Sequence, residues 1–168
     1  MLQGNICTMK KLIFLFLFIL ALGCKKETTL LPDKTTAPKQ LNSFTEGRRG
    51  LIIINNFSAK GSAQANEFGY EEDWIELFNT SANTLKLESG KWFLTDDTDA
   101  NPTKFELPEL TIEPYGKLII WCDDMNTIQD NIHTNFKLSS SGEKIGLFYF
   151  AGSEYSVIDV CSFCSVRK

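Results

Sequence analysis

This chain of 168 residues is poor in histidine, in cysteine and in long apolar runs. It has a single histidine, His133, which excludes any catalytic or metal site that needs several imidazoles. Its five cysteines are too few and too unevenly spaced for a small protein built on disulfides. The formal charge of -4 excludes a polycation of the kind that coats nucleic acid. What is present, 43% hydrophobic and 23% charged residues, is typical of a globular domain.

The most apolar segment lies near the N-terminus, at residues 12–22, and follows two lysines. It is shorter than the roughly 20 residues that a membrane-spanning helix needs, and it precedes a small residue and a cysteine, as in a secretory signal. The tetrad Ala21-Leu22-Gly23-Cys24 resembles the lipobox of bacterial lipoproteins, whose cysteine is lipidated and becomes the N-terminus. We therefore expect a lipoprotein signal peptide at 1–23 and lipidation of Cys24.

Residues 24–49 are expected to form a flexible tether, because they are rich in Thr, Lys and Pro and show no sustained apolar period. A lipid on Cys24 would attach the chain to a membrane of the bacterial cell envelope. Lys25 resembles the sorting pattern for the outer membrane, with the domain facing either the periplasm or the cell surface. The initiator methionine, Met1 or Met9, stays open.

From residue 50 onward, short β-rich runs alternate with turn residues. The clearest runs are 51–54, 74–78, 92–95, 117–122, 145–150 and 155–160, with weaker ones at 84–87, 104–107 and around 136–138. No segment has the period of a convincing amphipathic helix, and parallel strands would need longer connections. The sequence therefore predicts an all-β, antiparallel sandwich over 50–160 and a C-terminal tail at 161–168.

One segment carries a specific resemblance. Asp73-Trp74-Ile75-Glu76-Leu77-Phe78-Asn79 resembles the DWIEL-(F/Y)-N signature of the lamin tail domain, an immunoglobulin-like β-sandwich of nuclear lamins and of many bacterial secreted and anchored proteins. Further segments match the family in the correct order, which extends the resemblance from Leu51 to Asp159. The matching positions include Asp73, Trp74, Glu76, Asn79, Gly90, Trp92, Asp96, Gly116, His133, Phe136 and Gly142. The resemblance implies an immunoglobulin-like fold and marks no catalytic centre.

The C-terminal end departs from the family pattern. Residues 161–168 lack the usual final strand, so we expect that edge of the sandwich to be open or covered in another way.

An acidic turn offers a candidate cation site. Asp97, Asp99 and Asn101 spell the opening of a calcium loop, but the later EF-hand positions for glycine and glutamate hold Pro102 and Pro108. An EF-hand is therefore excluded. A looser calcium site and a solvated acidic turn both stay open.

The remaining reactive side chains have structural explanations. His133 is expected to make a hydrogen bond across a loop rather than to act as a catalytic base. Cys122, Cys161 and Cys164 are expected to be free thiols or to form one disulfide, either between Cys161 and Cys164 or between Cys122 and one of them. A zinc site lacks a fourth ligand.

Charge then separates the possible partners. Residues 50–160 contain seven basic and 18 acidic side chains, a net charge of -11, so a nucleic-acid partner is not expected. We expect a non-enzymatic module, without a cofactor, that binds or scaffolds an envelope protein or glycan. The alternatives are an accessory component of an extracytoplasmic hydrolase or nuclease system, with calcium, and a purely structural spacer.

Overall fold

The computed structural model describes residues 48–60 and 64–164. The predicted signal peptide, Cys24 and nearly all of the predicted tether lie outside these residues. Within the described part, no helix is long and apolar enough to cross a membrane.

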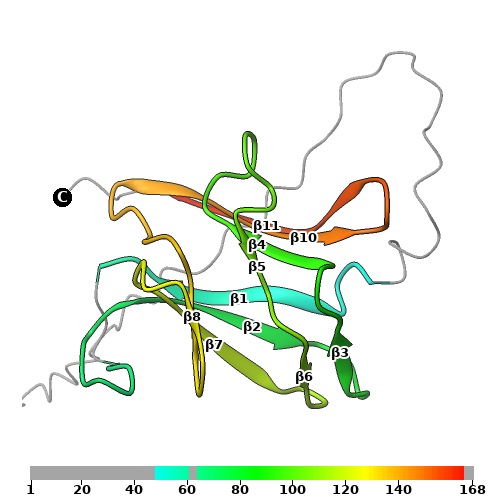
Figure 1. The fold of residues 1–168 in the computed structure, drawn as a ribbon, viewed down its shortest axis with the longest axis horizontal. Helices are drawn as coiled ribbons and strands as arrows, with labels where there is room; N and C mark the ends of the chain where they lie inside the picture. Colours follow the sequence, from blue (N-terminus) through cyan, green and yellow to red (C-terminus); the bar gives the residue numbers. More distant parts are fainter. Residues whose placement is uncertain (1–47, 61–63, 165–168) are drawn as a thin grey trace, which may run out of the picture.

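The described residues fold into two facing β-sheets, with the four-stranded sheet above the five-stranded one in Figure 1. The strands are β1 (Ile52–Ser58), β2 (Asp73–Asn79), β3 (Leu85–Leu87), β4 (Trp92–Thr95), β5 (Phe105–Glu106), β6 (Leu110–Ile112), β7 (Lys117–Cys122), β8 (Thr127–Ile128), β9 (Ile132–His133), β10 (Gly142–Phe150) and β11 (Tyr155–Cys164). One sheet has the order β1-β2-β7-β9-β8 and the other β11-β10-β4-β5, while β3 and β6 form a separate pair. The predicted all-β fold is confirmed.

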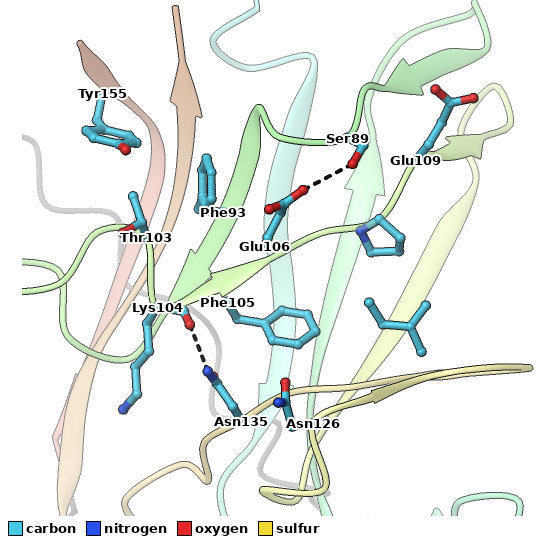
Figure 2. A pocket seen from close by; sticks show the side chains of 12 residues that line it. Ser89, Phe93, Thr103, Lys104, Phe105, Glu106, Glu109, Asn126, Asn135 and Tyr155 are labelled. Atoms are coloured by element: carbon cyan, nitrogen blue, oxygen red, sulfur yellow. Dashed lines mark hydrogen bonds between the residues drawn. The ribbon is translucent and has the colours of Figure 1, made fainter. Parts of the chain in front are cut away.

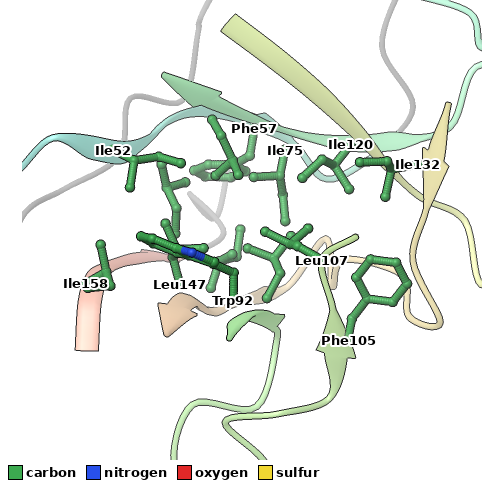
Figure 3. Packing of buried hydrophobic residues seen from close by; sticks show 14 of the residues in the cluster. Ile52, Phe57, Ile75, Trp92, Phe105, Leu107, Ile120, Ile132, Leu147 and Ile158 are labelled. Atoms are coloured by element: carbon green, nitrogen blue, oxygen red, sulfur yellow. The ribbon is translucent and has the colours of Figure 1, made fainter. Parts of the chain in front are cut away.

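Alternation along the strands produces the core between the sheets. Ile75 and Leu77 of β2 point inward beside Ile120 of β7, and all three are fully buried. Leu147 of β10 and Trp92 of β4 face them from the other sheet (Figure 3). Because full burial of a large apolar side chain contributes about 1.5–3 kcal/mol, this layer is the main source of stability.

At one side of the sandwich, the edge strands of the two sheets are linked to each other. The backbone N–H of Ile54 in β1 donates to Asp159 Oδ2 in β11 at 2.9 Å. Just before β1, the Arg49 Nε donates to the carbonyl of Val157 at 3.0 Å. We call this side, where β1 meets β11, the closed edge.

The last strand is longer than the sequence predicts. β11 continues to Cys164, which is the register partner of Gly142 in β10. Near its end, the ring of Phe163 packs on that of Phe57 with centroids 4.4 Å apart. The expectation of a missing final strand was therefore wrong, and residues 161–164 belong to the sandwich. Serine and cysteine have modest β-propensity, so the run of β-forming residues in the sequence ends before the pairing of β11 with β10 ends.

Three short strands, β6, β8 and β9, were not predicted, and the weak candidate at 136–138 is not a strand. Lys137 makes only an isolated bridge to Asp123. One pairing is parallel, between Trp121 of β7 and His133 of β9. This is possible with a short connection because β8 and β9 form a small hairpin that turns the chain back beside β7.

The cysteines are arranged differently from one of the predicted alternatives. Cys122 is a free thiol, fully buried in the core, and burial raises the pKa of this thiol well above its ordinary value. A bridge from Cys122 to the C-terminal cysteines is therefore not the observed arrangement. Cys161 is disulfide-bonded, and its partner is not among the side chains that the structure describes. The side chain of Cys164 also lies outside them.

Candidate functional site

The signature residues of β2 attach neighbouring loops to the sheet. Asp73 accepts hydrogen bonds from the backbone N–H of Lys60 at 2.7 Å and of Leu138 at 3.2 Å, which ties two loops to the start of β2. Glu76, only 9% exposed, accepts from Lys117 Nζ at 3.1 Å. Their carboxylates therefore serve the fold, as the resemblance implies.

Asn79 organises the turn after β2 in the same manner. Its fully buried amide donates to the carbonyls of Asn83, at 2.7 Å, and of Ile112, at 3.1 Å. Its Oδ1 accepts from the backbone N–H of Ser81 at 2.9 Å. One side chain thus joins the β2–β3 turn to β6.

Glycine is required at two signature positions, Gly90 and Gly116, for different steric reasons. Gly90 has a φ of 74°, a left-handed conformation that is strained for other residues. A Cβ on Gly116 would lie 2.8 Å from the carbonyl oxygen of Glu113, too close for any side chain. Both positions therefore fix turns that precede strands, β4 and β7.

His133 lies buried between two carboxylates. Its Nδ1 is 2.6 Å from Asp123 Oδ2, at the end of β7, and its Nε2 is 2.8 Å from Glu67 Oε1, in the β1–β2 loop. The ring of Phe68 packs at 5.8 Å between centroids. Only the imidazolium form donates from both ring nitrogens, so this geometry fits a charged histidine. We call Glu67, His133 and Asp123 the histidine clasp.

The electrostatics of the clasp support this protonation state. Burial opposes the charge on His133, but hydrogen bonds and attraction from Glu67 and Asp123 outweigh it, so the pKa of His133 is raised above its ordinary value. Both ring nitrogens face carboxylates, which leaves neither free to activate a serine or cysteine nucleophile. The expected hydrogen bond across a loop is present.

The acidic turn at 97–101 is occupied by its own interactions. Asp97 Oδ1 accepts from the backbone N–H of Ala100 at 3.1 Å, and Asp99 Oδ2 lies 3.6 Å from Lys144 Nζ. Asn101 Oδ1 accepts from the hydroxyl of Thr103 at 3.5 Å. Nowhere in 48–60 or 64–164 do three or more His, Cys, Asp or Glu side chains gather as metal ligands. The looser calcium site at Asp97, Asp99 and Asn101 therefore stays a prediction.

A groove of about 690 Å³ extends from Tyr155, at the start of β11, past Phe93 and along β5 to the side of the sandwich opposite the closed edge, where β5 and β8 end their sheets (Figure 2). We call this side the open edge. The groove is lined by Ser89, Phe93, Thr103, Lys104, Phe105, Glu106, Pro108, Glu109, Asn126, Ile128, Asn135 and Tyr155. Its volume is in the range of small-molecule sites. The structure thus gathers side chains from both sheets around an accessible hollow.

One wall of the groove is aromatic. The rings of Phe93 and Tyr155 meet edge to face, with centroids 5.8 Å apart and planes at 81°. Tyr155 is 46% exposed, so much of its ring is available to a ligand. Glu106 is the register partner of Phe93 and therefore shares this face of the sheet.

The opposite wall comes from the β7–β9 region. Asn126 has a φ of 51°, a left-handed conformation that asparagine tolerates, and it stands beside Ile128, which is 51% exposed. Deeper in, Asn135 Nδ2 donates to the carbonyl of Lys104 at 2.8 Å. The Oδ1 of Asn135 is buried and has no hydrogen-bond partner among the described atoms. An unpaired acceptor is therefore enclosed behind this wall, out of contact with solvent.

The match to known families decides the identity of the fold. The family model described as Lamin Tail Domain matches residues 46–163. The chain belongs to the lamin tail domain family. In this lamin tail domain the match extends through Phe163, which agrees with the long β11. No curated protein matches the chain.

The groove residues of this lamin tail domain were missed by sequence reasoning, which found the family signature instead. Tyr155, Phe93 and Asn135 come from three separate segments, and only the fold brings them together. No signal in the sequence alone marks this groove, because the exposure of the Tyr155 ring follows from the fold.

Proposed function

We propose that this chain is a membrane-anchored lipoprotein of the bacterial cell envelope, in the outer membrane, whose lamin tail domain is a non-enzymatic binding or scaffolding module. Its partner is an envelope protein or glycan. The observation that carries the proposal is the groove at the open edge, because a rigid sandwich presents an exposed aromatic wall there. The membership of the lamin tail domain family, an immunoglobulin-like binding fold, agrees with it.

A binding role also fits the chemistry around the titratable groups. Both ring nitrogens of His133 contact carboxylates, and the carboxylate of Asp73 in β2 holds a neighbouring loop by a hydrogen bond.

The net charge of the domain supports the choice of partner. With a net charge of -11 over 50–160, the domain would repel phosphate backbones, so a nucleic acid is not proposed.

The anchor rests on the resemblance of Ala21-Leu22-Gly23-Cys24 to a lipobox. Lipid attachment at this cysteine would hold the domain at the membrane, because each buried methylene contributes about 0.8 kcal/mol. The tether would then set how far the groove reaches from the bilayer.

The test follows the full chain in a Gram-negative bacterium fed with a radiolabelled fatty acid. The expected result is labelled protein in the outer-membrane fraction, with label and membrane association lost in Cys24→Ala. Cys7→Ala is the matched control, because it changes another cysteine of the N-terminal segment and should retain both. A soluble, unlabelled wild-type chain would contradict the anchor.

A second experiment addresses binding. A photo-crosslinking residue placed at Tyr155, in the groove wall, is compared with one at Tyr70, which is 64% exposed outside the groove. We expect a specific envelope product, protein or glycan, only from position 155. Equal products from both positions, or none, would remove the groove from the proposal.

A further inference from the structure

We propose that the groove of the open edge binds an uncharged glycan, a short chain of hydroxyl-rich sugars. This inference rests on the proposed binding function and names the class of its ligand. Three features of the described residues lead to this class: the state of the charges in the groove, the form of the β5 edge, and an exposed aromatic ring opposite an exposed amide side chain.

The charged side chains in the groove wall are already paired within the protein. Lys104 Nζ lies 2.7 Å from Asp96, and Glu109 lies 3.0 Å from Lys86 Nζ. These groups therefore present little free charge of either sign to a ligand.

Glu106 is engaged as well, in the turn that precedes β4. Its Oε1 accepts from the backbone N–H of Gly90 at 2.7 Å and from Ser89 Oγ at 3.1 Å. These donors are neutral, so the negative charge of Glu106 stays in the groove wall, where it disfavours an anionic ligand and is compatible with an uncharged one.

The β5 edge is poorly suited to an added peptide strand. The N–H of Leu107 donates to the carbonyl of Trp92 in β4 at 2.8 Å, so only Glu106 turns its amide and carbonyl away from the sheet. Pro108 has no N–H, and the carbonyl of Lys104 is taken by Asn135. Strand addition needs a row of free backbone groups, which β5 lacks. Recognition must therefore run through side chains.

The side chains that remain match the two kinds of surface on a sugar. Tyr155, 46% exposed, offers a ring face on which the C–H face of a pyranose can pack, and the buried Phe93 supports that ring edge to face. Asn126 is exposed in the opposite wall, and its amide can donate to and accept from sugar hydroxyls. Ile128 adds apolar surface on the opposite side. A glycan would cover the Tyr155 ring and pair with the Asn126 amide at the same time.

The experiment uses the lipidated full chain in detergent and isothermal titration with maltotriose and chitotriose as neutral probes. A heparin oligosaccharide and an unstructured decapeptide serve as charged and peptide probes. We expect binding of a neutral trisaccharide, at least tenfold weaker in Tyr155→Ala and unchanged in Tyr70→Ala. Tyr155→Phe, which keeps the ring, should lie within a few-fold of wild type. Ile128→Ser should weaken binding from the opposite wall.

The outcomes separate this inference from the proposed function. Binding of heparin or of the peptide alone, or neutral binding that ignores Tyr155, would overturn the glycan assignment. Absence of binding by every neutral probe at millimolar concentration would also overturn it. A protein crosslinked specifically at position 155 would then keep the proposed binding function while excluding the sugar. Loss of groove crosslinking altogether would contradict both.

Discussion

The closed and open edges of the sandwich differ in how they end their sheets. At the closed edge, a backbone N–H, a carboxylate and a guanidinium join β1 to β11, and two phenylalanine rings pack beneath them. At the open edge, β5 and β8 are two-residue strands separated by a groove. The two sheets are therefore joined to each other at the closed edge, while the open edge presents a groove to solvent.

The difference shows how a small sandwich accommodates an exposed hollow. Short edge strands with a proline resist unwanted pairing, while the long β10–β11 ladder supplies the cohesion that the other side lacks. The histidine clasp fixes the β7–β9 region next to the groove. We therefore expect substitutions at the closed edge to change stability and substitutions in the groove to change binding.

The largest effect is expected from Phe57→Ala at the closed edge. Phe57 is 4% exposed and packs on Phe163, so truncation leaves a cavity and should reduce the free energy of unfolding by about 3–5 kcal/mol. Urea denaturation measures it. Tyr155→Ala, a groove substitution of similar size, should cost about 1 kcal/mol or less. Equal losses of unfolding free energy in the two variants would contradict the expected difference between the closed edge and the groove.

His133→Gln tests whether the histidine clasp supports the open edge through charge. Removing the imidazolium leaves the buried carboxylate of Asp123 without its charged partner, which should cost about 3 kcal/mol at pH 6. Because the folded pKa of His133 is raised, its contribution is complete below its ordinary pKa and is lost as pH rises through the folded pKa. Unfolding curves from pH 5 to 9 should show a larger fall in wild type than in His133→Gln, which keeps only the contribution of Glu143. Parallel profiles would contradict a charged clasp.

Asp159→Ala is expected to loosen the link between β1 and β11. The N–H of Ile54 loses its acceptor, so the free energy of unfolding should drop by about 1–3 kcal/mol. Hydrogen exchange at the Ile54 amide should accelerate more than at Ile75 in the centre of the sheet. Asp159→Asn keeps a carbonyl oxygen and should recover much of the protection. No change in exchange would show that the closed edge is held without this contact.

The smallest effect, and a stabilising one, is expected from Glu143→Gln. Burial, with the nearby Asp96 and Asp73, raises the pKa of Glu143 to about 7, although the N–H of Ser139 donates to it. The native state then holds the proton more tightly than the unfolded chain, so stability falls as pH rises from about 4.5 to 7. At pH 8 the variant should gain about 1 kcal/mol, since partial solvent exposure reduces the full effect. Thermal melting at pH 4 and 8 checks it, and a gain at pH 4 would contradict the cause.

Much of the fold could be predicted because its signals are local. Alternation in β2 and the turn glycines marked strands directly, and the DWIELFN segment specified the family. The short strands β8 and β9 could not be predicted, because they depend on partners in β7 rather than on their own two residues. The end of β11 was not predicted because its pairing with β10 continues beyond the last residue of the hydrophobic pattern.

The candidate site was less predictable for a physical reason. The motif residues, such as Asp73 and Asn79, carry fold-specific hydrogen bonds and therefore repeat through a family. Tyr155 and Asn126 line one groove only because the fold brings their segments together, which sequence spacing does not encode. The hydrogen bond that the sequence predicts for His133 is present, but its second carboxylate, from Glu67, lies 66 residues away along the chain.

The contact between Arg49 and Val157 has a mechanical consequence. A domain held from its N-terminal side and pulled through its groove bears the load first on β1, where the chain enters the sandwich. The Arg49–Val157 and Ile54–Asp159 hydrogen bonds lie at that entry and would share the tension with the β1–β2 ladder. The closed edge would then act as the point of attachment against which a bound ligand pulls.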